Sequence, residues 1–265
     1  MLQILNLTNV RESKENKNIV KVKKILVSQP KPASDKSPYF DIEQKYGVEV
    51  VFRPFIVTEE VSAKDFRAQK INIADYSAII FNSKIAVDNF FRLCEEMRLT
   101  MPATQKYFCT SELIANYLQK YIVYRKRKVF VGKTAKIADL IPTMLKHKTE
   151  TYLMPVSDIN NGEEVALIAS NNLKVQSAVM YRTVPNTFGP DEAFDYDMLV
   201  FFSPQGIESL FTSFPDFKQG DIAIATFGAS TTKSAETAGL RVDVPAPTPE
   251  NPSMAAAIGA YLAKK

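Results

Sequence analysis

The chain has 265 residues, of which 46% are hydrophobic and 23% charged, and its formal net charge is +4. This length predicts roughly two domains, and the composition excludes a wholly disordered chain, a coiled coil and a collagen-like repeat. One histidine and two cysteines are too few for a structural zinc site or a disulfide framework, so we expect a protein of a reducing compartment.

No segment has the pattern of a membrane anchor or a secretory signal. Apolar runs stay well short of the roughly 18 residues that a spanning helix needs. The amino-terminal residues lack the continuous apolar core and cleavage site of a signal peptide. Residues 1–23, polar and charged over 11–18, are expected to form a flexible N-terminal arm. We therefore expect a cytoplasmic α/β or α+β protein without a membrane partner.

From Lys24 onward, short apolar runs alternate with amphipathic segments, which is typical of βα units. The first helix is expected from Pro38, behind Ser37, to about Tyr46, where Gly47 suits a C-cap. An alanine-rich last helix is expected over about 251–262. Strands are predicted at 25–27, 48–52, 78–81, 107–109, 129–131, 152–154, 175–180, 198–202 and 222–226, with a further extended segment at 55–58.

The sequence repeats itself at an offset of about 120 residues. Residues 76–83 (YSAIIFNS) align with 196–203 (YDMLVFFS) without a gap, and 108–111 (FCTS) align with 227–230 (FGAS). Both copies read strand, hydroxyl-bearing turn and helix, twice over. We therefore expect two similar α/β lobes; the alternative is chance similarity between apolar strands.

Serine and threonine follow four of the predicted strands. At the carboxyl end of a parallel strand the chain turns into a helix whose first amide N–H groups lack partners. A hydroxyl at this place can simply cap the helix, but the free amides and the helix dipole also attract anions. Four such turns would suit a ligand with several negative charges, and capping can coexist with binding.

Motifs of common catalytic and nucleotide-binding sites are absent: the sequence contains no GxxxxGK[ST], GxGxxG, HExxH or GxSxG. We interpret His147, which lies among lysines, as a surface residue, and Cys94 and Cys109 as buried thiols, although a Cys–His nucleophile pair stays open. The basic runs at 21–24 and 125–128 lead into apolar segments and are interpreted as solvated approaches to strands rather than a nucleic-acid surface. We expect chemistry without a metal, a bound nucleotide or a covalent nucleophile, and no nucleic-acid partner.

Several segments together carry a family resemblance. They are 76–87, 179–184 (VMYRTV), 197–206 (DMLVFFSPQG), 224–232 (IATFGASTT), 238–242 (AGLRV) and 247–249 (PTP). In this order and spacing they resemble the uroporphyrinogen-III synthase family, over about residues 24–262. The resemblance implies an α/β fold of two similar parallel-sheet lobes joined by a two-stranded β-ladder, with the first lobe discontinuous in sequence. Lobe 1 would comprise 24–53 and 188–265, the ladder 54–58 and 180–187, and lobe 2 59–179, with the ligand in the cleft between the lobes.

The family closes the linear tetrapyrrole hydroxymethylbilane to uroporphyrinogen III, inverting the last pyrrole ring and losing water, in haem biosynthesis. The resemblance thus implies a monomeric lyase without a cofactor, because the bilane cyclises unaided to the wrong isomer and mainly needs orientation. Its partners would be this substrate with eight carboxylates and, transiently, the enzyme that forms the bilane. The alternative is a non-catalytic two-lobed binding or regulatory protein for an anionic small molecule.

Positions that match the family's motifs give the expected site residues. Tyr181 would assist departure of the hydroxyl, as proton donor or through a hydrogen bond; otherwise it would pack across the ladder. Gly228 would let the backbone approach the ligand. Lys84 departs from the family, in which proline is commoner at this position, and would pair with a substrate carboxylate. Glu112 departs from the family pattern, so its turn should contribute less. The other implied substrate-binding residues are Ser83, Thr110, Ser111, Ser203, Gln205, Gly206, Ser230 and Thr231.

Overall fold

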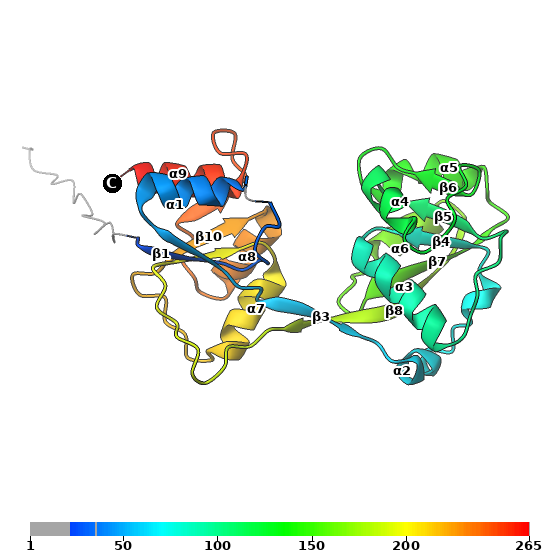
Figure 1. Ribbon diagram of the computed structural model, residues 1–265, viewed down its shortest axis with the longest axis horizontal. Helices are drawn as coiled ribbons and strands as arrows, with labels where there is room; N and C mark the ends of the chain where they lie inside the picture. Colours follow the sequence, from blue (N-terminus) through cyan, green and yellow to red (C-terminus); the bar gives the residue numbers. More distant parts are fainter. Residues whose placement is uncertain (1–21, 35, 265) are drawn as a thin grey trace, which may run out of the picture. The chain divides into compact units, whose positions relative to one another are not determined.

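The computed structural model describes residues 22–34 and 36–264 (Figure 1), so the expected N-terminal arm lies outside the described residues except for its last two. The chain is divided into two compact units. Unit 1 contains the described residues up to Phe55 and again from Pro185 onward, whereas unit 2 is the continuous stretch Ile56–Val184. Each unit is an α/β structure built on its own sheet.

Unit 1 has a five-stranded, fully parallel sheet in the order β11-β10-β9-β1-β2. Helices α1 and α9 cover one face and pack side by side, and α7 and α8 cover the other (Figure 1). The strands are β1 (Lys24–Val27), β2 (Glu49–Phe52), β9 (Met198–Phe201), β10 (Ala223–Phe227) and β11 (Val244–Ala246). The helices are α1 (Pro38–Tyr46), α7 (Pro204–Ser213), α8 (Ala229–Thr237) and α9 (Met254–Ala263).

Unit 2 has a six-stranded sheet in the order β3-β8-β7-β4-β5-β6, in which β8 to β6 are parallel. Helices α2, α3 and α4 cover one face, and α5 and α6 cover the other. The strands are β3 (Ile56–Glu60), β4 (Ala78–Phe81), β5 (Lys106–Cys109), β6 (Val129–Val131), β7 (Thr151–Ser157) and β8 (Lys174–Pro185). The helices are α2 (Ala63–Ala68), α3 (Lys84–Glu96), α4 (Glu112–Leu118), α5 (Ile141–Leu145) and α6 (Glu163–Ser170), with 3-10 turns at Ile73–Asp75 and Ile137–Asp139.

The predicted strands all overlap observed ones, and the first helix has the predicted bounds. Pro38 begins α1, and Gly47 ends it in the left-handed conformation (φ 63°) while donating its N–H to the carbonyl of Glu43. The last helix begins later than predicted, at Met254, because the Ser253 hydroxyl accepts from the amide of Ala256 and caps it there. Strand β11 was not predicted.

The two sheets share one strand order when unit 1 is read from β9. If β4 to β8 of unit 2 are numbered 1 to 5 in chain order, their order across the sheet is 3-2-1-4-5. If β9, β10, β11, β1 and β2 of unit 1 are numbered 1 to 5, their order across the sheet is the same. Strands β4 and β9 are separated by the sequence offset of 120 residues. Unit 1 is therefore a circular permutation of unit 2, completed by the two N-terminal strands.

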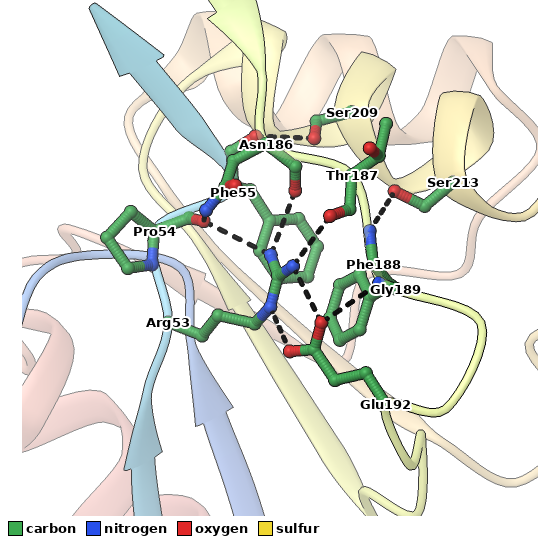
Figure 2. Close-up of polar contacts among 10 residues, drawn as sticks. All are labelled: Arg53, Pro54, Phe55, Asn186, Thr187, Phe188, Gly189, Glu192, Ser209 and Ser213. Atoms are coloured by element: carbon green, nitrogen blue, oxygen red, sulfur yellow. Dashed lines mark hydrogen bonds and ion pairs between the residues drawn. The ribbon is translucent and has the colours of Figure 1, made fainter.

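Arg53 ties the segment that leaves unit 1 to the segment that returns to it (Figure 2). Its guanidinium donates to the carbonyls of Asn186 (2.9 Å) and Thr187 (2.9 Å) and pairs with the carboxylate of Glu192. The guanidinium carbon also lies 3.6 Å from the centre of the Phe188 ring. One planar cation thus holds both segments through hydrogen bonds, an ion pair and stacking.

Candidate functional site

Each sheet has a point at which the direction of its connections reverses. In unit 2 this point lies between β4 and β7, because the helices that follow these two strands, α3 and α6, cover opposite faces of the sheet. In unit 1 it lies between β9 and β1, which are followed by α7 and α1 on opposite faces. In open α/β sheets, ligands bind beyond the carboxyl ends of the strands at such a point. Two of the predicted hydroxyl turns, at Ser83 and Ser203, lie at these places.

Ser83 connects strand β4 to helix α3. Its hydroxyl accepts a hydrogen bond from the amide of Ala86 (3.1 Å) and caps the helix. The amides of Lys84 and Ile85 precede the first intrahelical hydrogen bond, so they can donate to an acceptor beyond the helix end. The Lys84 side chain is exposed, with its ammonium group 5.2 Å from the centre of the Tyr117 ring. This turn therefore combines free amides, a helix N-terminus and a positive charge on a long side chain.

A β-bulge directs Tyr181 toward helix α3. Strand β8 pairs with β7 up to Val179 opposite Val156, but Ser157 then lies opposite Tyr181, which leaves Met180 as the extra residue. Adjacent side chains of a regular strand point to opposite faces. Here Met180 and Tyr181 both join the core cluster that α3 covers, and Tyr181 is only 9% exposed. The bulge thus turns the phenol onto the face where Ser83 caps its helix.

Side chains from other elements fix the backbone on both sides of the bulge. The Gln69 amide donates to the carbonyl of Val179 (2.7 Å) and accepts from its N–H (3.0 Å), and so replaces a neighbouring strand there. Beyond the bulge, the amide of Asp158 donates to the carbonyl of Tyr181 (3.2 Å). The Asp158 carboxylate accepts from the amide of Thr183 (3.0 Å). The position of Tyr181 is therefore held by hydrogen bonds and not by packing alone.

The surroundings of Tyr181 keep its phenol protonated. The pKa of Tyr181 is raised above its ordinary value of 10.0, chiefly by burial and also by the negative charge of Glu164. An interaction with the Ser83 hydroxyl lowers the pKa and offsets part of this effect. Glu164, on α6, accepts a hydrogen bond from the side-chain amide of Asn82 (2.8 Å). We call Asn82, Ser83, Glu164 and Tyr181 the Tyr181 cluster. At neutral pH its phenol can donate a proton or a hydrogen bond but cannot act as a base.

The second hydroxyl turn of unit 2, after β5, is less open. The Ser111 hydroxyl accepts from the amide of Ile114 (3.4 Å) and caps α4. Thr110 is 1% exposed, its hydroxyl is buried without a partner in the described part of the chain, and its amide donates to the carbonyl of Phe81. Glu112, the first residue of α4, is exposed. Thr110 therefore offers neither its hydroxyl nor its amide to a ligand, and the carboxylate of Glu112 lies at the start of the helix.

In unit 1, the turn after β9 repeats the geometry of the Ser83 turn. The Ser203 hydroxyl accepts from the amide of Gly206 (3.2 Å) and caps α7, and Gln205 is half-buried beside it. A side chain at position 206 would lie 3.3 Å from the ring of Phe201 and 3.8 Å from the Ser28 hydroxyl. Glycine thus permits a close approach here, and Ser28, at the end of the N-terminal strand β1, belongs to the same turn.

The turn after β10 differs from the other three. Gly228 precedes helix α8 with a left-handed φ of 91°, and no side chain caps this helix. The hydroxyl of Ser230 is inside the first helical turn and exposed, whereas Thr231 is buried. The amides of Ala229, Ser230 and Thr231 precede the first intrahelical bond, made by Thr232 to Gly228. This turn presents backbone donors where the sequence predicted mainly hydroxyls.

Sequence reasoning did not identify Asn82, Glu164, Gln69 and Ser28. Asn82 and Ser28 are the first residues after β4 and β1, so a search for any polar side chain at every strand end, and not for hydroxyls alone, would have found them. Glu164 and Gln69 lie on or beside helices with no motif around them, and only the fold brings them to β4 and β8.

Two further kinds of site are absent from the described residues. Within 22–34 and 36–264, no three His, Cys, Asp or Glu side chains are grouped so that they could hold a metal ion. None of the described helices is long and apolar enough to cross a membrane.

Comparisons with known proteins agree with this architecture. The model of the family described as uroporphyrinogen-III synthase HemD matches residues 41–256. The crystal structure of uroporphyrinogen-III synthetase from Helicobacter pylori is similar with a TM-score of 0.60 at 14% identity, covering 92% of this chain and 100% of that one. A mutant uroporphyrinogen III synthase from the extremely thermophilic bacterium Thermus thermophilus is similar with a TM-score of 0.53 at 15% identity and the same coverage. No curated protein sequence gave a significant match.

Proposed function

The chain belongs to the uroporphyrinogen-III synthase family, and we infer that it performs the family's reaction, the closure of hydroxymethylbilane to uroporphyrinogen III in haem biosynthesis. The enzyme is a lyase, because water leaves as the ring closes. The observation that carries this conclusion is the family match over residues 41–256, which includes Tyr181 and every predicted substrate-binding residue. The alternative of a non-catalytic binding or regulatory protein has no observation in its favour.

We propose that Tyr181 assists the loss of the hydroxyl group. The terminal C–O bond of the bilane breaks, and the departing hydroxyl takes a proton and leaves as water. A new C–C bond forms at the substituted carbon of the last ring, the older bond from that carbon to the third ring breaks and re-forms at the free carbon of the last ring, and that carbon then releases its proton. A buried, protonated phenol can supply that proton or a hydrogen bond. The nearby carboxylate of Glu164 would favour the positive charge that develops on the pyrrole as the oxygen leaves.

The turns of each unit are proposed to bind the carboxylates of the substrate. In unit 2 these are the amides of Lys84 and Ile85, the ammonium group of Lys84 and the turn at Thr110 and Ser111, where Ser111 carries the contact because the Thr110 hydroxyl is buried. In unit 1 they are the turn of Ser203, Gln205 and Gly206 and the uncapped amides after Gly228, at Ser230 and Thr231. Helix N-termini carry partial positive charge that formal charge does not count, so a net charge of +4 suffices for this ligand.

We further propose a cytoplasmic enzyme that acts as a monomer, uses no cofactor and receives the bilane in a transient contact with the enzyme that forms it. Two buried cysteines that form no disulfide support a reducing compartment. The spontaneous cyclisation of the bilane supports direct transfer, because a free substrate would be lost to the wrong isomer. Light scattering of the pure protein, alone and with the bilane-forming enzyme, measures both the monomeric state and the transient contact.

A coupled assay tests the activity. Freshly formed hydroxymethylbilane is offered to the purified chain, and the uroporphyrin isomers are separated after oxidation. We expect the III isomer to dominate and to form faster than the spontaneous reaction proceeds. Formation of the I isomer alone, at the spontaneous rate, would show that the chain is not a synthase and would favour the binding-protein alternative.

A further inference from the structure

Unit 2 contains a cavity of about 730 Å³ at the amino ends of strands β5 and β6. Gln105, which lines it, directly precedes β5, whereas Thr110 follows the other end of that strand. Helix α3 begins at the Ser83 turn and reaches the cavity with Cys94 and Glu95, near its last turn. Since this helix of 13 residues is roughly 20 Å long, the cavity is separate from the Tyr181 cluster.

Aromatic rings form one wall of this cavity. Phe91 and Tyr121 are stacked with ring centroids 4.7 Å apart and planes 4° from parallel, and the ring of Tyr107 lies beside Phe91 at an angle of 38° to it. Val123, also in the lining, is 81% exposed, although its side chain is wholly apolar. A volume of this size and an aromatic wall are typical of sites for small molecules.

The polar groups of the cavity favour an anion. Arg98, Arg125 and Lys128 line it against a single carboxylate, that of Glu95. The basic run 125–128, which the cyclisation does not use, thus supplies two of the three cations.

We propose that this cavity binds a small aromatic anion, a molecule that joins a flat ring system to one carboxylate or sulfonate group. The ring system lies against the stacked side chains of Phe91 and Tyr121, and the anionic group pairs with Arg98 and Arg125. The proposal does not depend on the cyclisation, because none of these residues belongs to the Tyr181 cluster or to the substrate turns.

Binding of 8-anilinonaphthalene-1-sulfonate, followed by its fluorescence, tests the proposal with two pairs of variants. In the first pair, Arg125→Glu reverses a charge in the lining, and Arg127→Glu reverses an exposed charge of the same basic run outside it. In the second pair, Ala103→Trp fills the cavity, and Ala138→Trp places the same ring on an exposed 3-10 turn elsewhere. Thermal unfolding of each variant confirms that it is folded.

We expect saturable binding to the wild-type protein with one site per chain. Arg125→Glu should weaken it by about fivefold, the scale of roughly 1 kcal/mol, Ala103→Trp should abolish it, and the two controls should stay within about twofold of wild type. The dye should not raise the KM for hydroxymethylbilane. Absence of saturable binding, equal affinity in each pair, or competition with the bilane would each overturn the proposal, and none of these results bears on whether the chain is a synthase.

Discussion

Replacement of Tyr181 by phenylalanine removes one hydroxyl and keeps the ring that the β-bulge places in the core. Proton donation by a positioned side chain contributes about 10²- to 10⁴-fold to a rate, so kcat should fall at least about a hundredfold, which corresponds to roughly 3 kcal/mol. The free energy of unfolding should change by less than about 1 kcal/mol, because the buried ring area is retained. The activity is measured as formation of the III isomer, and stability by urea unfolding.

Tyr152→Phe is the matched control, because Tyr152 is buried in the same sheet and its hydroxyl has no role in the proposed chemistry. That hydroxyl donates to the carbonyls of Met144 (3.2 Å) and His147 (3.1 Å). Its removal should cost about 1 kcal/mol of stability and leave kcat unchanged. The two variants are therefore expected to show opposite patterns, Tyr181→Phe losing activity and Tyr152→Phe losing stability.

The pH profile adds a second test of Tyr181. Because the pKa of this phenol is raised above 10.0, the donor stays protonated throughout the neutral and mildly alkaline range. We expect kcat to show no alkaline decline below about pH 9 from loss of this proton. A Tyr181→Phe variant with wild-type kcat, or an alkaline limb well below pH 9 that disappears in this variant, would refute the reasoning.

Three further predictions concern other groups. Ser83→Ala and Ser253→Ala each remove a helix N-cap and should each lower the free energy of unfolding in urea by about 1 kcal/mol. Only Ser83→Ala should raise the KM for the bilane. Equal KM values in the two variants would show that Ser83 is not part of the site. Glu164→Gln should lower kcat by roughly tenfold, whereas Glu163→Gln, at the exposed neighbouring position, should not; similar rates would exclude the proposed charge effect. Burial acts to raise the pKa of Glu150, but hydrogen bonds from Lys106 and Ser77 and the charge of Lys106 outweigh it, so the pKa is below 4.5. Glu150 therefore stabilises the fold above its unfolded pKa, and this contribution is lost as the pH falls through the folded value; from pH 5 to 3, urea unfolding of Glu150→Gln should show a smaller loss of stability than wild type.

The features that the sequence predicts well depend on neighbouring residues. Helix α1 has its proline and glycine at the predicted ends, because both residues act through their own backbone angles. Ser83 and Ser203 cap their helices as expected, because a hydroxyl reaches an amide only three residues along the chain. The strand runs are nearly continuous apolar segments, as parallel sheets with both faces covered require.

The features that the sequence does not predict depend on distant residues or on direction. Strand β11 has only three residues, with Pro245 in the middle. It was not predicted because proline argues against a central strand, and β11 lies at the edge of its sheet, where proline is tolerated. The contacts of Gln69 with Val179 and of Asn82 with Glu164 join positions 110 and 82 residues apart. Thr110 has the residue type that the turn suggests, but its side chain points into the protein.

Unit 1 contains the first described strand of the chain, but its sheet cannot be completed until strands near the C-terminus have been synthesised. Strand β1 lies between β2 and β9, and Ile25, Leu26 and Val27 are fully buried there. Strand β9 leaves the ribosome roughly 170 residues after β1, which takes about 10–35 s at common elongation rates. Unit 2, whose residues are contiguous, is complete before then. The strand made first must therefore wait with one edge unpaired, and such an edge is a place where a nascent chain can pair with another chain.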